Sequence, residues 1–354
     1  MTARERWHAV LARRKPDRLP MDYWATPEAT QRLLAHVGCA DEWALYRWLG
    51  IDRLSYLTPR YVGPPLPADQ NYYGCRYAQV PYGAPAAGQG VYEECVGHPL
   101  AECRTIADIE RMYTWPSPDW FDYAGLPARL HGRADYPVGA GHCEPFLVYC
   151  ELRGLELAFK DLVARPAMVE HCLARLFDFE YQRNVRIYEA LRGRVDVSYV
   201  AEDFGAQDRL LFSPQMIRRY FLPGMQRMVD LAHQAGAKVM THSDGAIRPI
   251  IPDLVAMGVD ILNPIQWRCA GMDRAALQRD FGAQLIFHGG VDNQQTLAFG
   301  TPADVEREVL DNVRLLGARG NYILAPCHNI QAITPPENVM ALYETGRRCT
   351  VSQV

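Results

Sequence analysis

The stretch AKVMTHSDG, residues 237–245, decides how the chain is interpreted. It begins as a mainly apolar run with the length of a buried strand and ends in a loop that carries His242 and Asp244. A similar stretch, YILAPCH at residues 322–328, ends with a cysteine and a histidine. In a barrel of parallel strands, the residues that follow each strand gather at one rim. The two stretches therefore predict that imidazole, carboxylate and thiol groups meet there, as they do in metal sites.

Short apolar runs of this kind recur along the chain and mostly alternate with amphipathic stretches typical of helices. Eight runs are predicted strands: residues 19–24, 53–57, 138–142, 195–201, 237–241, 259–263, 285–288 and 322–325. The main predicted helices are residues 4–14, 147–162, 167–191, 214–234 (capped by Ser213), 247–257, 273–281, 302–316 (capped by Thr301) and 336–347. No GxGxxG motif follows any of the strands, so an open dinucleotide-binding sheet is less favoured. The predicted fold class is α/β, a (β/α)8 TIM barrel.

Two further segments complete the predicted architecture. The helix at residues 4–14 is an N-terminal helical extension that precedes the first strand. Residues 61–98 are rich in proline, glycine and tyrosine, and alternate aromatic with polar residues, which predicts a hairpin-like insertion or binding loop. We expect residues 1–354 to form one large domain.

Composition excludes several classes of protein. The net charge is −4 and no block of basic residues occurs, which argues against a nucleic-acid partner. Neither a signal peptide nor an apolar run of membrane-spanning length is present, so we expect a cytoplasmic protein without a membrane partner. The ten cysteines include no CxxC pair and are expected to be reduced thiols. The sequence does not decide whether the protein forms a homodimer.

The residues that follow the predicted strands supply the candidate functional groups. Trp24, His142, Asn263 and His288 are candidates for substrate contacts, and Asp203, Asp292 and His328 for proton transfer or orientation. Loops are also polar for structural reasons. The carboxylates have such alternatives: Asp244 and Asp292 could cap helices, and Glu202 and Asp203 could pair with arginines.

Several motifs together resemble the uroporphyrinogen decarboxylase superfamily. They are AEDFG (201–205), SP (213–214) through FLP (221–223), HSDG (242–245), GVD (258–260), HGGVD (288–292) and PCHN (326–329) followed by TPPEN (334–338). The resemblance covers most of the chain, is densest over its last two thirds, and implies a TIM barrel.

The resemblance to the decarboxylase branch breaks down near the first strand. That enzyme uses no metal, and it holds its carboxylate-rich substrate with an arginine-rich segment and a buried aspartate. The corresponding residues here, 21–28 (MDYWATPE), contain no arginine, and the first one afterwards is Arg32. The sequence therefore argues against uroporphyrinogen as the substrate.

The other branch resembles methylcobalamin:coenzyme M methyltransferases and their corrinoid-linked relatives. These bind zinc through a His-x-Cys pair and a cysteine after the last strand. This sequence keeps His242 and Cys327 but has Asp244 in place of the middle cysteine. The resemblance thus implies Zn²⁺ held by His242, Cys327 and either Asp244 or Glu202, in a site with fewer thiolates that would suit an oxygen substrate better than a thiol.

The sequence therefore predicts a methyltransferase that moves a methyl group between a small-molecule donor or acceptor and a corrinoid such as methylcobalamin. The chain lacks a cobalamin-binding DxHxxG motif, so the corrinoid would be carried by a separate protein. The direction of transfer is open. A metal-free decarboxylase and a non-catalytic barrel that binds a corrinoid protein are the alternatives.

Overall fold

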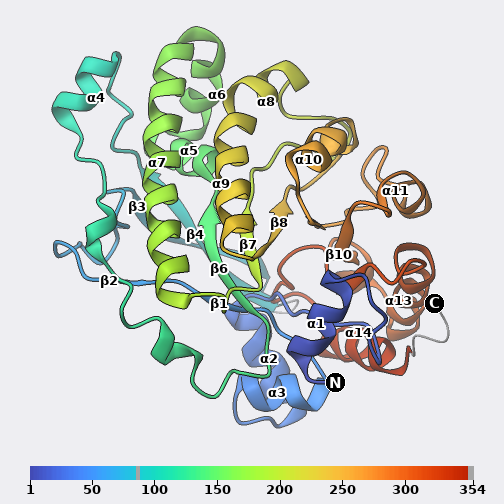
Figure 1. The fold of residues 1–354 in the computed structure, drawn as a ribbon. Helices are drawn as coiled ribbons and strands as arrows, with labels where there is room; N and C mark the ends of the chain where they lie inside the picture. The colour runs from blue at the N-terminus through green and yellow to red at the C-terminus, as the bar shows by residue number, and fades with distance from the viewer. Residues whose placement is uncertain (85–87, 350–354) are drawn as a thin grey trace.

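A curled sheet of seven parallel strands forms the centre of the molecule (Figure 1). The computed structural model describes residues 1–84 and 88–349. The strand order is β1-β6-β7-β8-β9-β10-β11, so neighbours in the sheet follow one another along the chain. The strands are β1 (Ser55–Leu57), β6 (Val138–Cys143), β7 (Val197–Val200), β8 (Lys238–His242), β9 (Ile261–Asn263), β10 (Ile286–Val291) and β11 (Tyr322–Pro326).

Residues 19–24, the first of the eight predicted strands, form no strand in the structure. Met21 makes a single parallel bridge to Leu324 of β11, and the Leu324 amide donates to the Pro20 carbonyl at 3.0 Å. On the other side, the Asp52 amide donates to the Met21 carbonyl at 2.7 Å, just before β1. Pro20 has no N–H to give to a strand ladder, which explains why pairing stays local. The prediction of eight strands is thus correct for seven, and a bridged segment lies in the eighth position.

Apolar side chains fill the space inside the sheet. The cluster contains one residue from each strand, or from just before it, except β6, together with two residues of the N-terminal helix: Leu54, Val197, Met240, Ile261, Ile286, Ile323, Trp7 and Val10. Trp7 is fully buried, and its indole N–H donates to the Asp52 carbonyl at 2.8 Å. Because Asp52 precedes β1, helix α1 (Ala3–Leu11) closes the amino-terminal end of the sheet, opposite the rim where the strands end.

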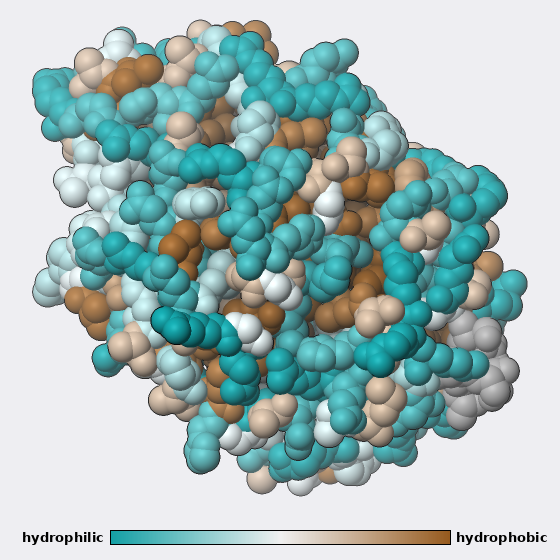
Figure 2. All heavy atoms as spheres, in the orientation of Figure 1, coloured by the Kyte–Doolittle hydropathy of each residue, from teal (hydrophilic) through white to brown (hydrophobic). Residues whose placement is uncertain are grey.

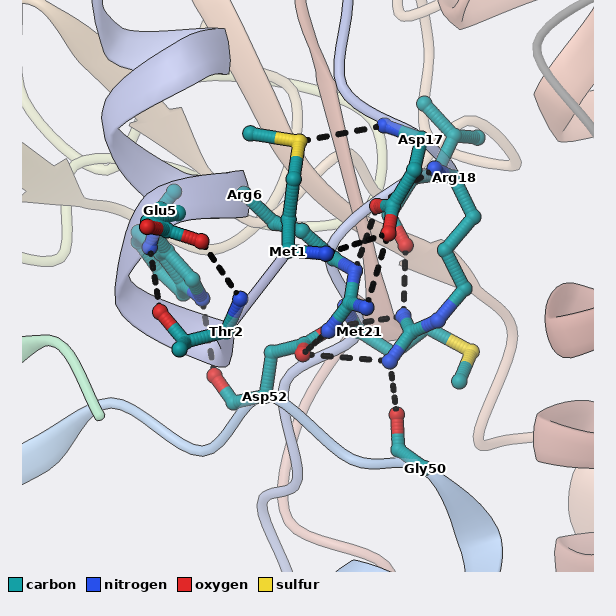
Figure 3. Close-up of polar contacts among 11 residues, drawn as sticks. Met1, Thr2, Glu5, Arg6, Asp17, Arg18, Met21, Gly50 and Asp52 are labelled. Atoms are coloured by element: carbon teal, nitrogen blue, oxygen red, sulfur yellow. Dashed lines mark hydrogen bonds and ion pairs between the residues drawn. The ribbon is translucent and has the colours of Figure 1, made fainter. Parts of the chain in front are cut away.

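Ion pairs hold α1 in this position (Figure 3). Arg6 donates to Asp17 at 2.7 Å and to Asp52 at 2.9 Å, and Arg18 donates to the other oxygen of Asp52 at 2.6 Å. The N-terminal amine of Met1 pairs with Asp17 at 2.9 Å. The carboxylate of Asp52 is buried, so two arginines compensate the cost of placing its charge inside the protein.

Replacing Trp7 by alanine is expected to lower the free energy of unfolding by about 3–5 kcal/mol, the usual cost of removing a large buried aromatic side chain. Urea unfolding followed by circular dichroism measures this change. The matched control is Trp48→Ala, because the Trp48 side chain in α3 (Glu42–Leu49) is exposed. Equal losses in the two variants would contradict the role of α1 as the closure of the sheet.

Helices cover the outside of the sheet, and Figure 1 shows α7 and α9 side by side across β6 and β7. The helices are α1, α2 (Pro27–Val37), α3, α4 (Ile106–Met112), α5 (Pro145–Arg153), α6 (Leu155–Ala164), α7 (Pro166–Leu191), α8 (Pro214–Tyr220), α9 (Leu222–Gln234), α10 (Ile251–Met257), α11 (Arg274–Phe281), α12 (Thr296–Phe299), α13 (Pro302–Leu316) and α14 (Pro336–Arg348). The predicted caps are confirmed, since the Ser213 and Thr301 side chains accept hydrogen bonds from the first turns of α8 and α13.

Two predicted long helices are each divided in the structure. The helix predicted at 147–162 becomes α5 and α6 because Gly154 has a φ of 86°, which breaks helical geometry. The helix predicted at 214–234 becomes α8 and α9, with Phe221 between them and Pro223 in the first turn of α9. Proline fits a first helical turn but not a helix interior, so the break falls just before it.

The insertion predicted over residues 61–98 contains an antiparallel pair, β3 (Arg76–Ala84) and β4 (Gly88–Gly97). Two shorter strands, β2 (Arg60–Tyr61) and β5 (Phe121–Asp122), form a separate antiparallel pair. The Tyr82 hydroxyl of β3 donates to the Gln331 side chain at 2.9 Å, beyond β11. The hairpin therefore reaches the loops that follow the last strand.

The surface seen in the orientation of Figure 1 is mainly hydrophilic, and its hydrophobic residues form separate patches (Figure 2). Among the described residues, none of the helices combines the length and the apolar character that a membrane crossing requires.

Candidate functional site

Three side chains from two segments that are distant in the sequence come together at the carboxyl ends of the strands. They are His242, the last residue of β8, Asp244 in the loop after it, and His328 in the loop after β11. One ligand atom of each lies within 4.8 Å of the others, and the described residues contain no second set of three with this property. We call His242, Asp244 and His328 the rim cluster.

The carboxylate of Asp244 lacks a hydrogen-bond donor for one of its two oxygen atoms. Its Oδ1 atom is buried and has no hydrogen-bond partner among the described residues. This atom lies 3.7 Å from His242 Nε2, and Asp203 Oδ1 lies 3.8 Å from the same nitrogen. Burial raises the pKa of Asp244, and the charge of Asp203 adds to this, whereas the two histidines of the cluster oppose it. An unpartnered buried oxygen beside two imidazoles fits a bound cation.

Close contact between two loops fixes the position of Asp244. Gly245 has a φ of 87°, and a Cβ there would come within 2.5 Å of the Ala206 carbonyl oxygen. Only glycine allows both this backbone conformation and this approach. The Asp244 amide donates to Asp203 Oδ1 at 3.0 Å, so the two carboxylates are held side by side.

Behind His242 lies a chain of buried polar side chains. His242 Nδ1 is 2.6 Å from Asn263 Oδ1, and Asn263 Nδ2 is 2.7 Å from His288 Nδ1. His288 Nε2 is 3.2 Å from Asp22 Oδ2. Asn263 and His288 were predicted to contact substrate, but both are fully buried and bonded to each other. Trp24 donates to Asp22 at 2.9 Å and stacks on the His242 ring at 6.0 Å.

Asp22 is charged in the folded protein. Burial alone would raise its pKa, but the Arg53 guanidinium and hydrogen bonds from His288 and the Leu54 amide lower it to about 2. In an unfolded chain an aspartate has a pKa of about 3.9. A lowered pKa adds stability above pH about 4, and this contribution is lost as the pH falls toward 2.

We therefore expect the wild-type protein to lose about 2 kcal/mol more unfolding free energy than Asp22→Asn between pH 5 and pH 2. Urea unfolding at a series of pH values measures this difference. Asp311→Asn is the control, since that carboxylate is partly exposed on α13. Parallel pH profiles for wild type and Asp22→Asn would contradict the prediction.

Cys327 and Glu202, which the sequence offered as metal ligands, lie outside the rim cluster, and His328 occupies a place in it instead. The Cys327 thiol donates to the Ile265 carbonyl at 3.3 Å, and burial raises its pKa well above the usual value. Glu202 accepts a hydrogen bond from the Phe146 amide at 2.7 Å, in the first turn of α5.

Two other predicted site residues have structural partners. Asp292 accepts from Arg268 at 2.8 Å and from the amides of Gln295 and Thr296 at the start of α12, so it caps that helix. His142 stacks on Tyr199 with ring centroids 5.3 Å apart. Of the three residues predicted for proton transfer, His328 lies in the rim cluster, Asp203 beside it and Asp292 outside it.

Two cavities open at this rim. The first, of about 470 Å³, includes Asp244, Cys327 and His328 in its wall, and we call it the amide cavity after six carboxamide side chains that line it: Gln207, Gln266, Asn293, Gln294, Asn329 and Gln331. The second, of about 310 Å³, is the aromatic cavity, lined among others by Trp24, Tyr56, His142, Tyr199 and Asn329. Trp24 and His142 were predicted to contact substrate, and their place in the wall of the aromatic cavity is compatible with that prediction. Asn329 belongs to the PCHN motif, but no role was predicted for it from the sequence. The other five amides form no sequence motif and were missed.

The lining residues of both cavities carry little free positive charge. Each cavity has one arginine among its described lining residues, Arg268 in the amide cavity and Arg53 in the aromatic cavity. Arg268 pairs with Asp292, and Arg53 pairs with Asp22. The site therefore favours a neutral or cationic ligand over a polyanion.

Comparisons with known proteins agree with this architecture. The profile of the family "Uroporphyrinogen decarboxylase (URO-D)" matches residues 103–349. A solved methyltransferase from Methanosarcina mazei is 19% identical, with 98% of each chain covered and a TM-score of 0.65, which shows the fold. A dihydropteroate synthase from Anaplasma phagocytophilum, solved with 6-hydroxymethylpterin-monophosphate, is 19% identical over 47% of this chain and 65% of its own, with a TM-score of only 0.28. No curated protein matches the sequence.

Proposed function

Because the chain belongs to the uroporphyrinogen decarboxylase (URO-D) family, we propose that it is a zinc-dependent methyltransferase of that family. It moves a methyl group between a heteroatom of a small molecule and a corrinoid carried by a partner protein. The observation that carries the proposal is the rim cluster with its unpartnered Asp244 oxygen. The similarity in fold to a methyltransferase from Methanosarcina mazei also supports it. We take the seven strands and the bridged segment at Met21 as one (β/α)8 barrel.

The donor set of the rim cluster suits zinc. Two imidazoles and one carboxylate are ordinary zinc ligands, and three protein ligands leave a position open for substrate, as in catalytic sites. Zinc in a site without thiolate ligands is a strong Lewis acid that would polarise a substrate oxygen. We therefore propose an alcohol, a phenol or the corresponding methyl ether as the reacting small molecule.

The residues around the cluster have distinct tasks. His242, Asp244 and His328 would hold the metal, and the half-exposed Asp203 carboxylate beside them can exchange the substrate proton with solvent. Asn329 borders both cavities, so the cluster lies where two reactants can approach each other. Orientation of the reactants would supply much of the rate enhancement.

The charge of the site argues against the family's namesake reaction. A substrate with several carboxylates needs several unpaired cations, and the described residues that line the two cavities offer only Arg53 and Arg268, both paired. One oxygen of Asp244 also lacks a hydrogen-bond donor among the described residues. A cation at the rim cluster would contact this carboxylate, but it would provide one positive site rather than several.

The test uses zinc-loaded full-length protein with free methylcobalamin as the methyl donor and a panel of alcohols, phenols and thiols. We expect cobalt to keep the electron pair of its methyl bond, the acceptor oxygen to gain the methyl group, and the acceptor proton to be released. Absorbance reports cob(I)alamin and mass spectrometry reports the methylated product. Decarboxylation of uroporphyrinogen by the metal-free protein, or tight binding of a corrinoid protein without turnover, would overturn the proposal.

A further inference from the structure

The buried chain behind His242 has a fixed direction that starts at Asp22. Each oxygen of this fully buried carboxylate faces donors only: the amides of Tyr23 and Leu54 and the Arg53 guanidinium reach Oδ1, and the Trp24 indole reaches Oδ2. An ionised carboxylate accepts hydrogen bonds and donates none. His288 Nε2, 3.2 Å from Oδ2, must therefore carry the proton of this contact.

The same orientation of the hydrogen bonds continues across the sheet, from His288 in β10 through Asn263 in β9 to His242 in β8. A neutral His288 that is protonated at Nε2 has an unprotonated Nδ1, which accepts from the Asn263 amide at 2.7 Å. The carboxamide then presents its oxygen to His242 Nδ1, 2.6 Å away, and that nitrogen must be the donor. Strand register supports the geometry, since His242 of β8 is the direct partner of Asn263 in β9.

We propose that Asn263 is a positioning residue that holds His242 as the Nδ1–H tautomer and thereby presents an unprotonated Nε2 to Asp244 and His328. The tautomer with the proton on Nε2 would leave that nitrogen without a lone pair for a metal. The inference rests on the proposed function only where it concerns zinc, because the tautomer is a property of the metal-free chain.

The first arm of the test is ¹H–¹⁵N correlation NMR of ¹⁵N-histidine-labelled, metal-free protein. His242→Gln assigns the His242 signals. We expect a protonated Nδ1 and an unprotonated, imine-type Nε2 for His242, and the opposite tautomer for His288. A protonated Nε2 on neutral His242 would overturn the inference, whatever the protein does with zinc.

The second arm measures the affinity for Zn²⁺ alone by calorimetry. Asn263→Leu removes both hydrogen bonds and is expected to weaken zinc binding about 10- to 100-fold, the usual effect of losing a partner behind a metal ligand. Asn263→Asp keeps an acceptor for His242 Nδ1 and is expected to recover affinity to within about tenfold of wild type. The control is Asn321→Leu, a fully buried asparagine at the start of β11 that bonds the Leu285 carbonyl.

The two arms separate the inference from the proposed function. If the wild-type protein shows the expected tautomer but binds no zinc, the inference is supported and the proposed zinc site is wrong. Zinc binding that is equally strong in wild type and folded Asn263→Leu would retain the metal and overturn the inference. Equal weakening by Asn263→Leu, Asn263→Asp and Asn321→Leu would show general destabilisation and would also overturn it.

Discussion

Replacing His242 by alanine is expected to reduce the affinity for Zn²⁺ by more than about 100-fold, beyond the 10- to 100-fold effect of losing an outer partner of a ligand. His242 contributes the imidazole closest to the unpartnered Asp244 oxygen, with Nε2 at 3.7 Å. Its removal leaves Asp244 and His328 as the only members of the cluster. Calorimetry with Zn²⁺ and metal analysis after dialysis both measure the loss, and methyl transfer should disappear with it.

The control for this variant is His233→Ala. His233 lies on α9 and pairs with Asp260 at 2.8 Å, on the outside of the sheet. We expect this variant to bind zinc as the wild type does. Equal zinc binding by wild type and a folded His242→Ala protein would mean that the rim cluster does not hold the metal.

The second large effect separates two neighbouring residues. His328→Gln is expected to weaken zinc binding by about 100-fold or more, because it removes a ligand rather than an outer partner. Cys327→Ser is expected to stay within about threefold of wild type, because a serine hydroxyl can replace the thiol as donor to the Ile265 carbonyl. The same calorimetric titration measures both variants.

The reverse result would identify the ligand set that the sequence implied. If Cys327→Ser loses zinc while His328→Gln retains it, the thiol binds the metal and His328 has another role. Unfolding measurements on both proteins distinguish loss of a ligand from loss of structure, since Cys327 is buried and His328 lines the amide cavity.

The sequence predicts which loops meet but not which side chains face the site. Parallel strands end at one rim, so the apolar runs before His242 and before Cys327 were enough to bring their loops together. The choice between Cys327 and His328 depends on the backbone beyond β11. The Cys327 amide still pairs with the Val291 carbonyl at 2.8 Å and its thiol is bonded to the Ile265 carbonyl, whereas the His328 ring reaches His242 and Asp244.

Other differences have equally local causes. Asn263 and His288 were singled out as candidates for substrate contacts, yet they lie behind His242. Asn263 ends β9 and His288 lies within β10, and both side chains are buried and bonded to each other. Glu202 and Asp292 instead meet amides at the starts of α5 and α12. The cap formed by Asp292 was one of the alternatives that the sequence offered. Sequence spacing does not show that the start of α5 packs against Glu202, so that partner could not be predicted.

The most direct test of the metal site is X-ray diffraction from zinc-loaded crystals at energies on either side of the zinc absorption edge. We predict one anomalous peak bonded to His242 Nε2, the Asp244 carboxylate and the His328 ring, with Cys327 still directed at the Ile265 carbonyl. A peak held by His242 and Cys327 without His328, or no peak among these side chains, would contradict it.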